Sequence, residues 1–164
     1  MNNIFKRTSV RNYKDISVED EKIELILKAA MAAPSAMNQQ PWEFYVVTNR
    51  EKLIELSDAT PYSKMVKDSA VTFVVCYRND SLREMFREID CAACTENMLL
   101  EIEDLGLGGV WIGVAPKEDN MENVRKIMDI PEILSPFALV ACGYPEKEQA
   151  QKDRFNPERV HYIK

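Results

Sequence analysis

Residues 32–42 read AAPSAMNQQPW and lie between a predicted helix and a predicted strand. The stretch combines small residues, prolines, amide side chains and a tryptophan, and no charged residue occurs between Lys28 and Glu43. Connecting loops lie on the surface and usually carry charge, whereas binding residues often lie on loops that a rigid scaffold positions. We therefore predict that this loop forms one wall of a cofactor-binding site.

The two flanks of the loop have opposite periodicities. Before it, Ser17 is a plausible helix N-cap, acidic residues follow in the first turn, and apolar side chains recur at helical spacing at positions 23, 26, 27, 30 and 31. This helix is predicted to end by Pro34. After the loop, residues 42–48 are rich in aromatic and β-branched side chains and predict a strand.

The rest of the chain alternates strands and helices. Residues 70–77 are almost continuously apolar, which predicts a strand in the middle of a sheet. A short helix at 3–9 is predicted before an extended segment, and longer helices are predicted at 50–58, 82–105 and 117–128. Gly106 is expected to cap the helix at 82–105. Two further strands are predicted at 110–114 and 137–142. No repeat or linker divides the chain, so we expect one α/β sandwich-like domain over residues 1–164.

Size and charge restrict the function classes. The chain has 164 residues, 46% of them hydrophobic and 29% charged, which is sufficient for a core without crosslinks. A net charge of -6 argues against nucleic acid or an anionic membrane as the main partner. No apolar run is long enough to span a membrane, and the first residues lack a signal-peptide pattern, so a cytoplasmic location is expected.

The usual catalytic side chains are scarce. His161 is the one histidine, and no Gly-x-Ser-x-Gly elbow occurs, so nucleophilic catalysis is poorly supported. Cys91 and Cys94 share a helix face and could ligate a metal with another cysteine, but the alanines between them favour buried packing. We therefore predict four reduced, structural cysteines and no metal site. The glycines at 106–109 do not complete a dinucleotide-binding fingerprint.

Positive charge gathers near both ends of this acidic chain. Arg7, Arg11, Lys152 and Arg154 could bind a phosphate with help from hydroxyls at 8 and 9, although such residues could equally be solvated surface charges. A phosphorylated flavin needs a phosphate clamp, an apolar wall and donors for the polar edge of its ring. The segments 7–11, 34–40 and 109–113 offer these three parts.

Together, three motifs carry a family resemblance. FKRTSVRNY at 5–13, AAMAAPSAMNQQPW at 29–42 and GLGGVWIG at 106–113 resemble the FMN-dependent nitroreductase family, and residues 130–145 resemble its last core strand. The match covers nearly the whole chain in the same order, which is far more specific than any single motif.

The resemblance implies an α+β fold with a mixed sheet flanked by helices, assembled as an intertwined homodimer with two FMN sites at the interface. Residues 146–164 are polar, contain too little apolar surface to fold alone, and are expected to pack on the partner subunit. The implied cofactor-binding residues are Arg7, Thr8, Ser9, Arg11, Pro34, Ser35, Asn38, Gln40, Gly109, Ile112, Gly113, Lys152 and Arg154. The loop residues 34–40 would come from the other subunit.

The implied activity is FMN-dependent NAD(P)H oxidation by a ping-pong mechanism, with nitroaromatics, quinones or similar electron-poor compounds as acceptors. Arg11 would stabilise negative charge on the reduced flavin, and no catalytic side chain would otherwise be required. Thr8 departs from the basic residue common at that position, and the chain is short enough to leave the pocket open. Two alternatives stay open: a flavin-binding sensor without turnover, and another flavin reaction such as dehydrogenation, dehalogenation or flavin destruction.

Overall fold

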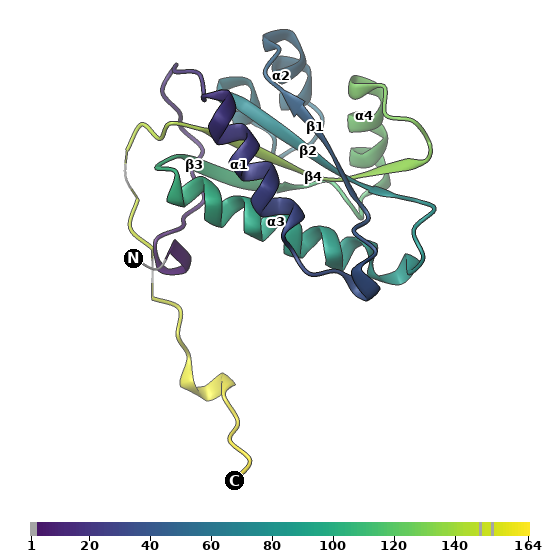
Figure 1. Ribbon diagram of the computed structural model, residues 1–164. Coiled ribbons are helices and arrows are strands. Elements are labelled where there is room, and N and C mark those ends of the chain that lie inside the picture. The colour runs from purple at the N-terminus through teal and green to yellow at the C-terminus, as the bar shows by residue number, and fades with distance from the viewer. Residues whose placement is uncertain (1–2, 148, 152) are drawn as a thin grey trace.

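The computed structural model describes residues 3–147, 149–151 and 153–164 and centres on a four-stranded sheet (Figure 1). Its strands are β1 (Trp42–Val47), β2 (Val71–Arg78), β3 (Gly108–Gly113) and β4 (Leu134–Gly143), in the spatial order β1-β2-β4-β3. All three pairings between these strands are antiparallel. An isolated parallel bridge joins Ser9 to Gly109 beside β3, so parallel pairing enters through the N-terminal segment.

Helices cover both faces of this sheet (Figure 1). α1 (Asp20–Met31) and α3 (Arg87–Asp104) pack on one face, while α2 (Arg50–Ser57) and α4 (Glu118–Met128) cover the other. The remaining helical elements are short 3₁₀ turns: η1 (Asn3–Phe5), η2 (Ala36–Asn38), η3 (Lys64–Asp68), η4 (Glu84–Phe86) and η5 (Pro157–Arg159). The α+β fold with a sheet flanked by helices is confirmed.

Alternation along the central strands produces the two cores. Val71, Phe73 and Val75 of β2 point into the core under α1 and α3, while Val74 and Cys76 point into the core under α2 and α4. Successive side chains of a strand face opposite sides, and both faces are covered here. This explains why β2 reads as a continuous apolar run, and its position between β1 and β4 confirms the predicted central strand.

Close packing joins the N-terminal segment to the sheet. The amide of Val10 donates to the carbonyl of Gly109 at 3.0 Å, and a Cβ added at Gly108 would lie 2.8 Å from the side chain of Val10. The buried Tyr13 hydroxyl donates to the carbonyls of Val10 (2.7 Å) and Ala141 (3.2 Å), and burial raises the Tyr13 pKa well above its ordinary value. Residues 9–13 are therefore fixed against β3 and β4.

Element boundaries differ from the sequence prediction in several places. α1 begins at Asp20 with Glu19 as its N-cap residue rather than Ser17, and no side-chain cap bond forms. The predicted helix at 82–105 divides into η4 and α3, and Gly106 follows the C-cap residue Leu105 with a φ of +72°. β3 begins at Gly108 rather than at the predicted residue 110, because Gly108 and Gly109 pair with β4.

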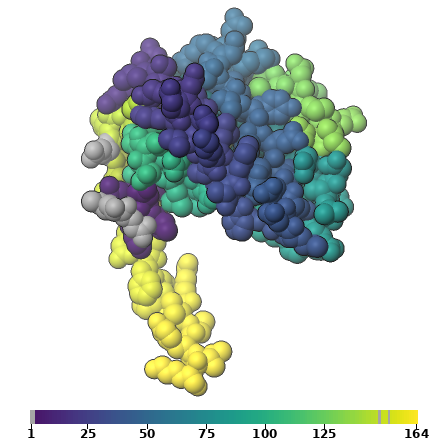
Figure 2. All heavy atoms as spheres, viewed as in Figure 1, coloured from purple at the N-terminus to yellow at the C-terminus, as the bar shows by residue number. Residues whose placement is uncertain are grey.

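The C-terminal segment leaves the body of the domain. In Figure 2 the last residues, drawn in yellow, extend away from the other described atoms. Phe155 is 74% exposed and Tyr162 is 80% exposed on this segment. Apolar side chains of this size are normally buried in folded proteins, so the segment carries contact surface that its own chain does not use.

All four cysteines are unpaired and buried, which confirms their prediction as core residues. Burial raises the pKa of Cys76, Cys94 and Cys142 to about 12, and it also raises the pKa of Cys91. Within the described residues, no group of three metal-ligating side chains comes together. None of the helices described is long and apolar enough to cross a membrane.

Candidate flavin site

A pocket of about 380 Å³ opens beside β3. It brings together Arg11 from the N-terminal segment with Ile112 and Gly113 from β3, three residues that the sequence analysis assigned to one site. Its other lining residues are Pro61, Tyr62, Lys64, Met65, Val110 and Trp111. The pocket therefore combines two cationic side chains with apolar and aromatic ones, a lining typical of small-molecule sites.

Arg11 is an exposed cation beside this pocket. Its Nη1 donates to the carbonyl of Ser9 at 3.3 Å, and no carboxylate of the described residues pairs with it. Gly113 is exposed, and a Cβ added there would meet nothing within 4 Å, so this end of β3 is open. Gly109 is instead buried, and its backbone pairs with Ser9 and β4. Gly109 thus holds the N-terminal segment rather than facing the pocket.

The other N-terminal candidates face different neighbours. The Nε of Arg7 lies 3.5 Å from Glu96 Oε1 on α3. Thr8 lines a separate pocket of about 470 Å³, together with residues of the C-terminal segment. Thr8 and Arg11 are three residues apart, and on an extended segment only residues two apart point to the same side. Thr8 therefore lies apart from the pocket that Arg11 lines.

The 32–42 loop has an unusual backbone held by side-chain contacts. Met37, Asn38 and Gln40 have φ values of +51°, +53° and +46°. Ser35 Oγ accepts a hydrogen bond from the Gln40 amide at 3.0 Å. Left-handed backbone is uncommon for residues other than glycine, and it persists where surrounding contacts determine it. Pro34, Asn38 and Gln40 are exposed, so the loop presents them outward.

Asp90 on α3 anchors this loop. Its carboxylate accepts hydrogen bonds from the Ala36 amide at 2.9 Å and from Gln39 Nε2 at 2.6 Å, and Asp90 is only 4% exposed. Gln39 Oε1 also accepts from the Arg83 amide at 2.7 Å. Gln40 was predicted as a site residue and Gln39 was not, although Gln39 is the buried amide that holds the loop.

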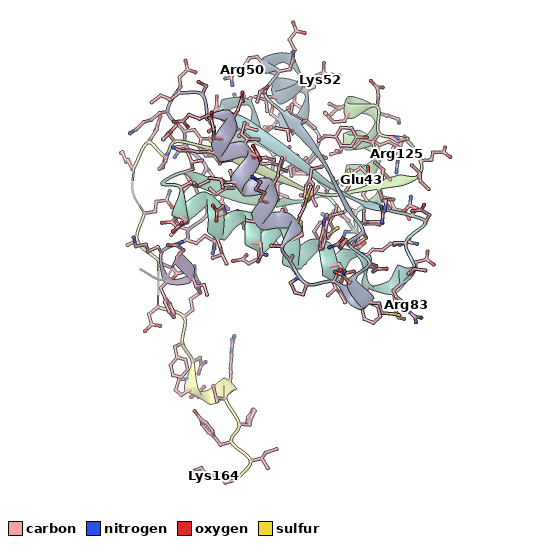
Figure 3. The ribbon with its side chains drawn as sticks, viewed as in Figure 1. Glu43, Arg50, Lys52, Arg83, Arg125 and Lys164 are labelled. Atoms are coloured by element: carbon pink, nitrogen blue, oxygen red, sulfur yellow. The ribbon has the colours of Figure 1, made fainter. Side chains whose placement is uncertain are left out.

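The loop and the N-terminal turn η1 are anchored at opposite ends of α3. Asp90 holds the loop near the start of the helix, and Asp104 near its end accepts a hydrogen bond from Asn3 at 2.6 Å. Fourteen residues of α-helix separate these anchors by about 21 Å. Figure 3 likewise shows Arg83 beside the loop, far from the N-terminal turn. Within one chain, none of the loop residues lines the pocket with Arg11.

The predicted C-terminal clamp is only partly described. Arg154 is exposed on the extended segment, and Lys152 lies outside the described residues. Tyr62 and Lys64 were missed by the sequence analysis even though they line the pocket with Arg11. They lie in or beside η3, where no motif or periodicity distinguishes them from surface residues. Glu96 was also missed, because its contact with Arg7 joins residues far apart in the sequence.

A known protein family matches most of the chain. The model of the nitroreductase family matches residues 4–60 and 55–144, which include the N-terminal segment, the loop and β3. The chain belongs to the nitroreductase family. This confirms the family resemblance.

Other nitroreductases resemble the chain over nearly its full length. A protein of Archaeoglobus fulgidus, provisionally named NADH dehydrogenase/NAD(P)H nitroreductase, is 44% identical over 96% of this chain and 94% of its own. A crystal structure from Clostridium acetobutylicum, provisionally named an NADH oxidase, is 40% identical with a TM-score of 0.96, covering 99% of both chains. An FMN-dependent nitroreductase from Clostridium difficile is 28% identical with a TM-score of 0.92, covering 99% of this chain and 98% of that chain.

Proposed function

We propose that this chain is an FMN-dependent NAD(P)H oxidoreductase that passes electrons to nitroaromatics, quinones or similar electron-poor compounds. The observation that carries the proposal is the pocket that joins Arg11 to Ile112 and Gly113. Its donor set fits the isoalloxazine ring of FMN, since a cation faces an apolar strand end whose glycine leaves space for a flat ring. The FMN-dependent relative from Clostridium difficile supports the same cofactor.

When bound, FMN supplies the two-electron redox chemistry. The guanidinium of Arg11 stabilises negative charge that develops at the polar edge of the pocket, because a fixed cation needs little reorganisation during the reaction. Ile112 supplies an apolar contact that excludes water, and Gly113 leaves room for the donor and the acceptor to use the pocket in turn. Arg7 and Ser9, with Lys152 and Arg154, are proposed to hold the phosphate chain.

The visible spectrum tests this function directly. We expect a yellow protein that bleaches when NADH or NADPH is added without oxygen and recolours when an electron acceptor follows. A colourless protein that FMN cannot reconstitute would refute the proposal. A yellow protein that neither nicotinamide reduces would instead indicate flavin binding without turnover.

We further propose that two copies of the chain form an intertwined homodimer in the cytoplasm, and that each site takes its 34–40 loop from the partner. Supporting this, the loop anchor at Asp90 and the η1 anchor at Asp104 are about 21 Å apart along α3. None of the loop residues lines the pocket with Arg11 in the same chain. The exposed Phe155 and Tyr162 support residues 146–164 as an extension that packs on the partner. Four unpaired cysteines suit a reducing compartment.

Mixed dimers test the ownership of the loop. Arg11→Glu and Pro34→Glu each place a carboxylate in one half of the proposed site, and each homodimer should lose its flavin. A dimer with one copy of each variant has one intact site if the loop acts on the partner, and none if both halves belong to the same chain. We expect one bound flavin per mixed dimer; a flavin-free mixed dimer would disprove the exchange.

A further inference from the structure

Arg7 is held from two sides. Its Nε lies 3.5 Å from Glu96 Oε1 on α3, and its backbone carbonyl accepts a hydrogen bond from Gln151 Nε2 at 3.2 Å. The same Gln151 amide donates to the carbonyl of Ile4 at 2.9 Å, and Asn3 bonds Asp104 at 2.6 Å. Arg7 and the turn before it are therefore joined to α3 and to the C-terminal segment without a ligand.

The geometry of the guanidinium gives the Glu96 contact a specific consequence. An arginine side chain has many rotamers, and ordering them for one ligand costs free energy. Pairing at Nε fixes the plane of the group while its two terminal nitrogens keep their N–H donors, the pair suited to bidentate phosphate binding. The Arg7 side chain is 22% exposed, so its surroundings restrict its rotamers more than those of a fully exposed arginine.

The negative charge of Glu96 also opposes the binding of an anion. Its side chain is 50% exposed, however, and water screens an exposed charge strongly. The same screening weakens the pairing of Glu96 with Arg7, so orientation and repulsion oppose each other. We take orientation as the larger effect, and the alanine variant of Glu96 decides between them.

We propose that Glu96 is a positioning residue that sets the affinity for the phosphate of FMN by orienting Arg7. The proposal rests on the proposed function, because it takes FMN as the ligand and Arg7 as part of its phosphate clamp. It assigns to Glu96 an effect that depends on the ligand phosphate. Riboflavin has the same ring system without the phosphate and is the matched ligand for testing it.

Flavin fluorescence titration of the flavin-depleted full chain measures both ligands. For Glu96→Ala we expect the FMN dissociation constant to rise about fivefold, because Arg7 loses its fixed orientation, while the riboflavin constant stays within about twofold. Glu96→Gln keeps a side chain of the same length with an oxygen beside Nε, so its FMN affinity should remain within about twofold of the original chain. A role in folding alone would move both ligands together and would not distinguish alanine from glutamine.

Glu24→Ala is the matched control, because Glu24 pairs with Lys28 at 2.6 Å on the exposed surface of α1. It should leave both constants unchanged, and thermal unfolding should show all variants folded. Unchanged or tighter FMN binding by Glu96→Ala overturns the positioning role, as does an equal loss for riboflavin. If the original chain binds riboflavin and FMN equally, the phosphate clamp fails while flavin binding stands; if it binds neither, the proposed function fails as well.

Discussion

Replacing Gly108 with alanine tests whether close packing against β3 positions the N-terminal half of the site. The added Cβ would lie 2.8 Å from Cβ, Cγ1 and Cγ2 of Val10, closer than such atoms approach without a shift. Val10 is 5% exposed and its amide bonds Gly109, so neither side can yield freely. Overpacking of this kind costs about 1–3 kcal/mol, which lowers the melting temperature of a chain this long by roughly 2–12 °C.

The same displacement should reduce FMN binding, since Arg7 and Arg11 lie on either side of Val10. Thermal unfolding and flavin titration measure the two effects. Gly113→Ala is the control for stability, because its Cβ would meet nothing within 4 Å and should leave the melting temperature unchanged. Adding Val10→Ala removes two of the three clashing atoms. The double variant should therefore lose less unfolding free energy than the two single variants lose in sum. An unchanged melting temperature and flavin affinity in Gly108→Ala would refute this packing argument.

Three further predictions concern the clamp, the loop and the thiols. Arg154→Ala should weaken FMN binding by about 1.5 kcal/mol, roughly tenfold, because one exposed charged contact to phosphate is lost; unchanged affinity in a titration would exclude Arg154 from the clamp. Asp90→Ala should destabilise the chain by about 1–3 kcal/mol and expose the 32–42 loop to protease, because the buried Gln39 amide and the half-buried Ala36 amide lose their acceptor. Calorimetry and timed digestion measure this, and intact stability would contradict it. Burial raises the pKa of Cys76, Cys94 and Cys142 from 9.0 to about 12, so unfolding releases protons between those values. The free energy of unfolding should therefore be steady below pH 9 and fall above it by about 1.4 kcal/mol per pH unit for each thiol. Urea titrations at about pH 8 and about pH 10 measure this, and equal stability at the two pH values would contradict it.

Local patterns predicted the elements well where one face or both faces are apolar. The central position of β2 follows from its continuous apolar run, and α1 follows from its helical spacing of buried side chains. Boundaries were less accurate because pairing partners decide them. Gly108 and Gly109 look like a turn in the sequence, but their pairing with β4 and the approach of Val10 place them in a strand.

Site residues that belong to family motifs were predicted from the sequence. Contacts between residues far apart in the sequence were not. Arg11, Ile112 and Gly113 came together as expected in one pocket. Gln39 and Asp90 could not be paired from the sequence, since 51 residues separate them and neither position has a distinguishing pattern. The assignment of the loop to a partner subunit stays a prediction, as do the roles of the remaining clamp residues.

Gly108 and Gly143 together fix the register of the N-terminal segment against the sheet. Val10 fills the space at Gly108, and Tyr13 fills the space at Gly143, where an added Cβ would lie 3.1 Å from the tyrosine ring. A slip of one residue would turn every side chain of the segment to the opposite side and leave both spaces wrongly filled. Two uncharged contacts therefore decide on which side of the segment the charges of Arg7 and Arg11 lie.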